Sequence, residues 1–151
     1  MNKSRPGWDE YFFNMLGGIA SRSTCLRRQI GALIVKDNYI IVTGYNGQPT
    51  GMKHCSDSGE CLRQQLNIPS GQRAEICKAV HAEENAFLQA AREGKSIKGG
   101  TLYVKCSPCS YCTKSLITVG IVRVVYKSEY PDDLARELRE EVTWVKFDKI
   151  Y

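Results

Sequence analysis

Apolar residues recur along the chain with two different periods, and the alternation of these periods predicts an α/β protein. Residues 30–36 and 39–45 are rich in β-branched and aromatic side chains and are separated by Asp37-Asn38, which predicts a hairpin with a tight turn. Before them, residues 8–20 show the spacing of a helix with one buried face, with apolar side chains at Trp8, Tyr11, Phe12, Met15, Leu16 and Ile19.

The second half of the chain repeats this alternation. The resulting element order, α-β-β-α-β-α-β-α-β, predicts a three-layer α-β-α sandwich around a mixed five-stranded sheet. The expected helices are residues 80–93, 109–119 and 131–141, and the expected strands are 101–104, 121–126 and 142–147.

Residues 46–78 interrupt the pattern. They have no clear period, are rich in Gly, Pro, Ser and Gln, and are long for a connection inside a compact domain. A segment this polar cannot hold itself by apolar burial, so we expect it to be functional or to be held by a metal. With no repeats, low-complexity tracts or linkers elsewhere, we expect residues 1–151 to form one domain with an insertion at about 47–78.

Composition narrows the class of protein. The chain has 151 residues, of which 42% are hydrophobic and 25% are charged, as in a small globular protein. Its apolar runs have the length of strands, and its first eight residues lead into no apolar signal core, so we expect a cytoplasmic protein that does not bind a membrane. The net charge of +5 suits an anionic small molecule, and the scattered basic residues argue against a nucleic-acid partner.

Two short segments carry the strongest chemical signal. They are His81-Ala82-Glu83 and Pro108-Cys-Ser-Tyr-Cys112, with 24 residues between Glu83 and Pro108. One imidazole and two thiolates leave a tetrahedral zinc ion one coordination position that a water can fill. A nearby carboxylate that is not a ligand can move protons around that water. This set and spacing are typical of zinc-dependent nucleobase deaminases.

Both segments are expected at helix N-termini. His81 and Glu83 begin one helix, while Cys109 and Cys112 lie in the first turn of the next, where the i, i+3 spacing puts both on one side. The helix dipole at this end favours thiolates. The alternative is a closed structural site that adds Cys106 to these ligands. We do not include Cys106 among the ligands, because Pro108 should prevent Cys106 at the end of a strand and Cys109 on the helix from binding one ion. A closed site would also leave Glu83 without a function.

The sequence resembles the deoxycytidylate (dCMP) deaminase branch of the cytidine deaminase superfamily over about residues 8–147. The resemblance implies a cytidine deaminase-like fold and a zinc hydrolase that converts dCMP and water into dUMP and ammonia, which supplies dTTP synthesis. The matching stretches are residues 23–25, 42–47, 81–86, 101–104, 108–112 and 120–126.

The resemblance also implies roles for individual residues. His81, Cys109 and Cys112 hold the catalytic zinc, and Glu83 passes a proton from the water to N3 of the pyrimidine and later to the departing amine. Asn46 matches a substrate-contacting asparagine, with a turn residue as the alternative. Weaker candidates are Tyr126 and Tyr130, which would close over the nucleotide, and Arg28, Lys105 and Lys127, which would bind its 5′-phosphate.

The remaining cysteines match a second, structural zinc site in the same branch. Cys25 stands at the end of the first helix, and Cys55, Cys61 and Cys77 lie in and around the insertion, so a closed Cys₄ site is available. The branch often has a histidine among these four ligands, which makes His54 a competitor of Cys61.

The resemblance further implies a homo-oligomer, commonly a hexamer, that dCTP activates and dTTP inhibits at an interface site with Mg²⁺. The catalytic motif alone does not name the substrate. The alternatives are a dCTP, guanine or tRNA-adenosine deaminase, or a zinc-scaffolded binding module without catalysis.

Overall fold

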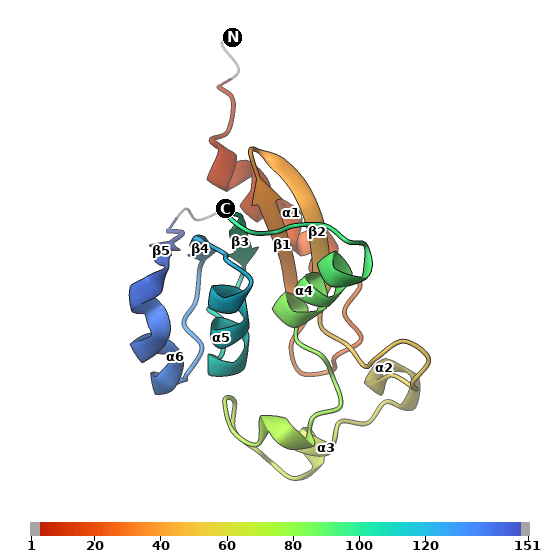
Figure 1. The fold of residues 1–151 in the computed structure, drawn as a ribbon. Helices are drawn as coiled ribbons and strands as arrows, with labels where there is room; N and C mark the ends of the chain where they lie inside the picture. Colours follow the sequence, from red (N-terminus) through yellow and green to blue (C-terminus); the bar gives the residue numbers. More distant parts are fainter. Residues whose placement is uncertain (1–3, 149–151) are drawn as a thin grey trace.

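The computed structural model describes residues 4–148. Its centre is a five-stranded sheet with the strand order β2-β1-β3-β4-β5 (Figure 1). The mixed sheet predicted from the sequence is confirmed. Its first three strands are antiparallel and the last two continue in parallel: β1 (Gly31–Lys36), β2 (Tyr39–Tyr45), β3 (Thr101–Val104), β4 (Arg123–Tyr126) and β5 (Thr143–Lys146).

Helices cover both faces of the sheet. Helix α1 (Trp8–Ala20) packs on one face, and α4 (Ala82–Arg92) and α5 (Ser110–Thr118) pack on the other (Figure 1). Helix α6 (Asp133–Glu137) and a 3₁₀ helix (Leu138–Glu141) lie beside α5. Among residues 4–148, no helix is long and apolar enough to cross a membrane.

Side chains of the central strands alternate between the two layers of helices. In β1, Ala32 and Ile34 join the core under α4 and α5, whereas Leu33 and Val35 join the core under α1. All four are buried, which explains why this strand reads as a continuous apolar run. The sheet is therefore the shared wall of two cores.

The predicted hairpin is present. Lys36 pairs with Tyr39 across a two-residue turn in which Asp37 and Asn38 have φ values of 51° and 61°. Positive φ at both central residues is the requirement of a type I′ turn, which Asn and Asp tolerate better than other side chains.

Most element ends differ from the sequence prediction by one or two residues, and two of the differences are informative. The helix expected at 131–141 is divided into α6 and the 3₁₀ helix that follows it. The strand expected at 121–126 starts at Arg123, because the backbone of Ile121 still bonds to the carbonyl of Leu116 at the end of α5. Gly120, with φ of 83°, makes this turn.

The segment expected to be an insertion leaves the sheet after β2 and returns at α4. It carries α2 (Cys55–Ser58), α3 (Leu62–Gln65) and a 3₁₀ turn (Ala74–Ile76), and it extends beyond the sheet near the start of α4 (Figure 1). Cys61 is the only buried residue between residues 49 and 79. The segment therefore has almost no apolar core of its own.

Candidate active site

The start of α4 is fixed against the end of β2. Gly47 and Val80 form an isolated β-bridge with two backbone hydrogen bonds of 3.2 and 2.8 Å. Gly44 lies so close to the helix that a Cβ atom there would overlap the carbonyl oxygen of Ala82. These contacts place His81 at the N-cap of α4, where its imidazole makes no capping bond and faces the site.

The start of α5 is fixed in a similar way. Cys106 and Ser128 form a second isolated bridge just beyond β3 and β4. The chain then turns so that Cys109 is the N-cap of α5. The carboxylate of Asp132 accepts the N–H of Ser110 at 2.7 Å and satisfies a free donor of the first turn.

His81, Cys109 and Cys112 converge in front of these two helix ends. The Nδ1 atom of His81 lies 3.4 Å from Sγ of Cys109 and 3.6 Å from Sγ of Cys112. In a tetrahedral zinc site, with Zn–N of about 2.0 Å and Zn–S of about 2.3 Å, nitrogen and sulfur lie about 3.5 Å apart. Among residues 4–148, this is the one group of potential ligands whose donor atoms all lie within 4.8 Å of one another. The three residues fit a zinc ion.

The pKa values of these three residues also indicate a cation site. The hydrogen bond with Cys112 lowers the pKa of Cys109 to about 4, and the same contact raises the pKa of Cys112. The hydrogen bond with Cys109 raises the pKa of His81 to about 9. Two sulfurs this close cannot both ionise without a positive charge between them. A divalent cation supplies that charge and replaces the shared protons.

Glu83 stands beside the three potential ligands. It occupies the first turn of α4, and its side chain is only 6% exposed. Burial raises the pKa of its carboxyl to about 7, while the neighbouring His81 imidazole opposes this rise. A cation bound to the three donors would favour the carboxylate further. Glu83 is thus a buried carboxyl group whose protonation depends on the charge held by the three donors.

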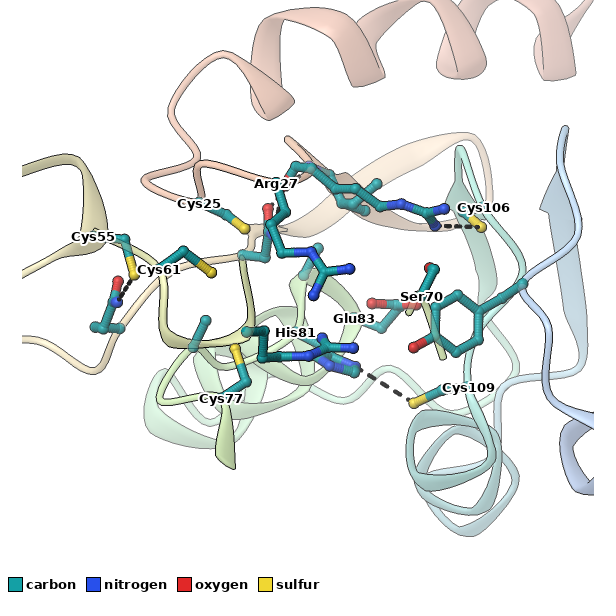
Figure 2. A pocket seen from close by; sticks show the side chains of 18 of the residues that line it. Cys25, Arg27, Cys55, Cys61, Ser70, Cys77, His81, Glu83, Cys106 and Cys109 are labelled. Carbon is teal, nitrogen blue, oxygen red and sulfur yellow. Dashed lines mark hydrogen bonds between the residues drawn. The ribbon is translucent and has the colours of Figure 1, made fainter. Parts of the chain in front are cut away.

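One cavity is lined by two of the three donors, by Glu83 and by several other residues singled out in the sequence. His81, Glu83 and Cys109 line it (Figure 2). The substrate candidates Asn46, Tyr130 and Arg28 line it as well. Tyr126, Lys105 and Lys127 are not among the residues that line it. The hydroxyl of Tyr126 instead donates to Glu129 at 2.6 Å, outside the cavity.

The side chain of Asn46 is held by hydrogen bonds at the edge of the cavity. Its Oδ1 accepts hydrogen bonds from the hydroxyl of Ser23 at 2.6 Å and from the backbone of Ile30 at 2.9 Å. Its Nδ2 donates to the carbonyl of Arg28 at 2.8 Å. These bonds orient the amide and leave one N–H for a ligand.

Two arginines that the sequence analysis did not single out also line the cavity. Arg27 comes from the loop after α1, and Arg63 comes from α3 in the insertion. Arg27 Nη1 and Arg63 Nε are buried and have no hydrogen-bond partner among residues 4–148. The sequence carries only a weak indication that these arginines belong to the site. Arg27 lies two residues after Cys25, and Arg63 lies two residues after Cys61.

The four cysteines expected to form a second metal site line the same cavity. In Figure 2, Cys25, Cys55, Cys61 and Cys77 gather on one side, with His81, Glu83 and Cys109 toward the other. All four are free thiols. Their sulfur atoms are less closely grouped than the donors of the His81 group.

Cys106 lies apart from the His81 group. It is buried, and its Sγ lies 3.9 Å from Nη1 of Arg28. Among the described residues, it is not part of the group of potential ligands formed by His81, Cys109 and Cys112.

A three-layer α-β-α fold with His, Cys and Cys donors at two helix N-termini and a buried carboxylate beside them is the arrangement typical of the zinc-dependent deaminase class. Residues 6–128 match the family model described as "Cytidine and deoxycytidylate deaminase zinc-binding region". The chain belongs to the cytidine and deoxycytidylate deaminase family, and the resemblance seen in the sequence is confirmed.

Individual relatives agree with this assignment. The chain is 44% identical over 131 residues to the deoxycytidylate deaminase of Mycobacterium phage D29, an alignment that covers 83% of this chain and 98% of the phage protein. It is 39% identical over 132 residues to the deoxycytidylate deaminase of Schizosaccharomyces pombe. That alignment covers 87% of this chain, which spans 40% of the length of the yeast protein.

A solved structure has the same fold. The dCMP deaminase of cyanophage S-TIM5, in complex with dCMP and dUMP, superimposes with a TM-score of 0.75 at 27% identity. The match covers 96% of this chain and all of the cyanophage chain (100%).

Proposed function

We propose that this protein hydrolyses dCMP to dUMP and ammonia. The observation that carries the proposal is one shared cavity. It is lined by His81 and Cys109 of the zinc-type donor group, by the buried Glu83, and by two arginines that have unpaired N–H groups. The names of the phage, yeast and cyanophage relatives support dCMP as the substrate.

Glu83 is the proposed proton carrier. A zinc ion held by His81, Cys109 and Cys112 supplies Lewis-acid activation of water. Glu83 accepts a proton from the attacking water and delivers it to N3 of the pyrimidine. It then carries the second proton of that water to the amine that leaves from C4, so that the products are dUMP and ammonia. The burial of Glu83 keeps bulk water from competing for these protons.

Arg27 and Arg63 are the proposed ligands of the 5′-phosphate. Arg27 Nη2 donates to the carbonyl of Ile68 at 3.0 Å, and Arg63 Nη2 donates to that of Gln72 at 2.6 Å. These carbonyls orient the two guanidinium groups and leave their remaining donors for an anion. A buried N–H without a partner costs roughly 1–3 kcal/mol, which a phosphate oxygen would recover. Arg28, at the same cavity, is a further candidate.

Asn46 and Tyr130 remain proposed contacts to the base and sugar. Asn46 has one free amide N–H at the cavity, and Tyr130 lines it. Tyr126 is a weaker candidate, because its hydroxyl is already bonded to Glu129.

Substrate preference tests the phosphate assignment. We expect the wild type to have a higher kcat/KM for dCMP than for deoxycytidine or dCTP. Arg63→Gln should lower kcat/KM for dCMP by about 10- to 100-fold and leave that for deoxycytidine within about threefold. Arg73→Gln is the matched control, because Arg73 lies in the same insertion, is 59% exposed and pairs with Glu75.

Two outcomes would contradict the proposal. Equal losses of kcat/KM for dCMP and deoxycytidine would show that Arg63 supports the insertion and does not bind the phosphate. A wild type that deaminates deoxycytidine or dCTP in preference to dCMP would refute the assigned substrate.

We also propose that Cys25, Cys55, Cys61 and Cys77 hold a structural zinc that pins residues 47–78. The four side chains come from separate turns and reach one side of the cavity, in a segment without its own core. Cys61 is favoured over His54, because Nδ1 of His54 is already bonded to the hydroxyl of Thr24 at 3.0 Å. His54 is also not among the residues that line this cavity.

We further propose a homo-oligomer, with a hexamer favoured, that dCTP activates and dTTP inhibits at an interface site with Mg²⁺. Support for self-association comes from the edge strand β2 and the outer face of α4, where Tyr39, Ile40, Tyr45 and Leu88 are exposed. The rate curve against dCMP should be sigmoidal and become hyperbolic with dCTP. A monomer with a hyperbolic curve would contradict this proposal.

A further inference from the structure

The segment after β4 runs beside the segment after β3, and backbone hydrogen bonds join them. The N–H groups of Lys127 and Ser128 donate to the carbonyl of Lys105 at 3.1 and 3.0 Å, and the N–H of Ser107 donates to Ser128 at 2.8 Å. The parallel pairing of the two strands thus continues up to Pro108. The turn that presents Cys109 is therefore built on residues 127–132.

The carboxylate of Glu129 is the centre of a hydrogen-bond network in this segment. It accepts bonds from the hydroxyl of Tyr126 at 2.6 Å and from that of Ser107 at 3.2 Å. It also accepts bonds from both terminal nitrogens of Arg139, at 3.2 and 2.7 Å. Arg139 lowers the pKa of Glu129 to about 2, so the carboxylate is ionised at neutral pH.

Arg139 is itself firmly placed. Its guanidinium carbon lies 4.6 Å from the centroid of the Trp144 ring and 5.3 Å from that of Tyr126. The indole N–H of Trp144 donates to the carbonyl of Arg139 at 3.1 Å. The arginine side chain is only 20% exposed, so this bidentate pair holds Glu129 more rigidly than a surface ion pair would.

Ser107 connects this network to the cavity. Its hydroxyl donates to Glu129 and accepts the backbone N–H of Tyr130 at 2.8 Å. Ser107 is 3% exposed, so water does not compete for these bonds. On the other side of Tyr130, Asp132 is bonded to Ser110 at the start of α5. The backbone of Tyr130 is therefore held on both sides, because the N–H of Asp132 also donates to the carbonyl of Tyr130 at 2.9 Å, and Tyr130 lines the cavity at this place.

We propose that Glu129, held by Arg139, is a positioning residue that fixes Tyr130 against the bound nucleotide through the hydroxyl of Ser107. This inference rests on the proposed deamination of dCMP. It assigns a function to a pair of charges outside the cavity. Because Glu129 acts through Tyr130, its removal should weaken substrate binding and leave the metal ligands in place.

A double-mutant cycle on dCMP turnover tests this coupling. We expect Glu129→Ala to raise KM for dCMP by about tenfold, with kcat changed less than threefold and the zinc content unchanged. Arg139→Lys, which keeps the charge but not the bidentate bonds, should raise KM in the same direction. In the Glu129→Ala/Tyr130→Ala protein, the loss should not exceed that of Tyr130→Ala alone. The matched control is Asp133→Ala, because Asp133 also pairs with an arginine and is 92% exposed.

Several results would overturn the positioning role. Additive losses in the double variant would mean that Glu129 does not act through Tyr130. An unchanged KM in both Glu129→Ala and Arg139→Lys, or zinc loss in these variants, would also overturn it. A wild type without activity on dCMP would refute the proposed function itself. An active wild type, together with additive losses in the double variant, would refute only the positioning role.

Discussion

The Nδ1 atom of His81 lies 3.4 Å from the Sγ atom of Cys109, although 28 positions separate the two residues in the sequence. Each is the N-cap of its helix, and both helices lie on the same face of the sheet. A backbone bridge precedes each of them, Gly47 with Val80 and Cys106 with Ser128. The backbone around the two helix ends therefore holds the donor atoms close together.

The zinc content of purified variants tests both proposed metal sites. We expect two zinc ions per chain in the wild type and one in either Cys109→Ser or Cys61→Ser, because each change removes a ligand from one site. Cys106→Ser and His54→Ala are the controls and should retain two. One zinc per chain in the wild type would contradict the proposed structural site. Two zinc ions per chain in Cys109→Ser would contradict the proposed catalytic site.

Replacing Gly44 with alanine should disturb the start of α4. The added Cβ would overlap the carbonyl oxygen of Ala82, and backbone atoms cannot move aside as a flexible side chain can. We expect the free energy of unfolding to fall by about 3 kcal/mol and zinc binding to weaken. In Gly17→Ala, within α1, the new Cβ meets no atom within 4 Å, and stability should rise by about 0.5–1 kcal/mol. Equal stability of the two variants would contradict this account.

An ion pair between α1 and β4 makes stability depend on pH. Asp9 accepts hydrogen bonds from Arg123 at 2.8 and 2.5 Å and from the hydroxyl of Tyr103 at 2.7 Å. Arg123 holds the pKa of Asp9 below its usual value. A folded-state pKa below the unfolded one stabilises the protein above about pH 4, and this stabilisation is lost as the pH falls through the folded value.

We therefore expect Asp9→Asn to lower the free energy of unfolding at pH 7 and to have less effect near pH 3. The side chains of Asp9 and Arg123 are 34% and 30% exposed, so solvent screening limits the difference at pH 7 to about 1 kcal/mol. Urea unfolding at both pH values measures it. Asp133→Asn, at a carboxylate that is 92% exposed, should show little effect. A difference for Asp9→Asn that is constant between these pH values would contradict the assignment.

The sequence predicted those parts of the molecule that depend on local patterns. The helix at residues 8–20, the hairpin at Asp37-Asn38 and the mixed sheet follow from periodicity and turn chemistry. The convergence of His81 with Cys109 and Cys112 follows from motif spacing.

Features that depend on tertiary contacts escaped prediction. The helices of the insertion are four residues each, too short to show a period. Arg27 and Arg63 resemble surface charges in the sequence, and only the carbonyls of Ile68 and Gln72 reveal how they are oriented. Likewise, no local pattern shows that Tyr126 bonds to Glu129 rather than facing the cavity.

The most direct test of the central claim is ammonia release from dCMP by Glu83→Gln beside Glu84→Gln. Glu84 is the next residue on the same helix and is exposed, so it controls for the loss of a carboxylate. We expect Glu83→Gln to lower kcat by at least about 1,000-fold with zinc content and Tm unchanged, and Glu84→Gln to match the wild type. A Glu83→Gln protein that binds zinc and keeps more than about a tenth of the wild-type rate would contradict the account.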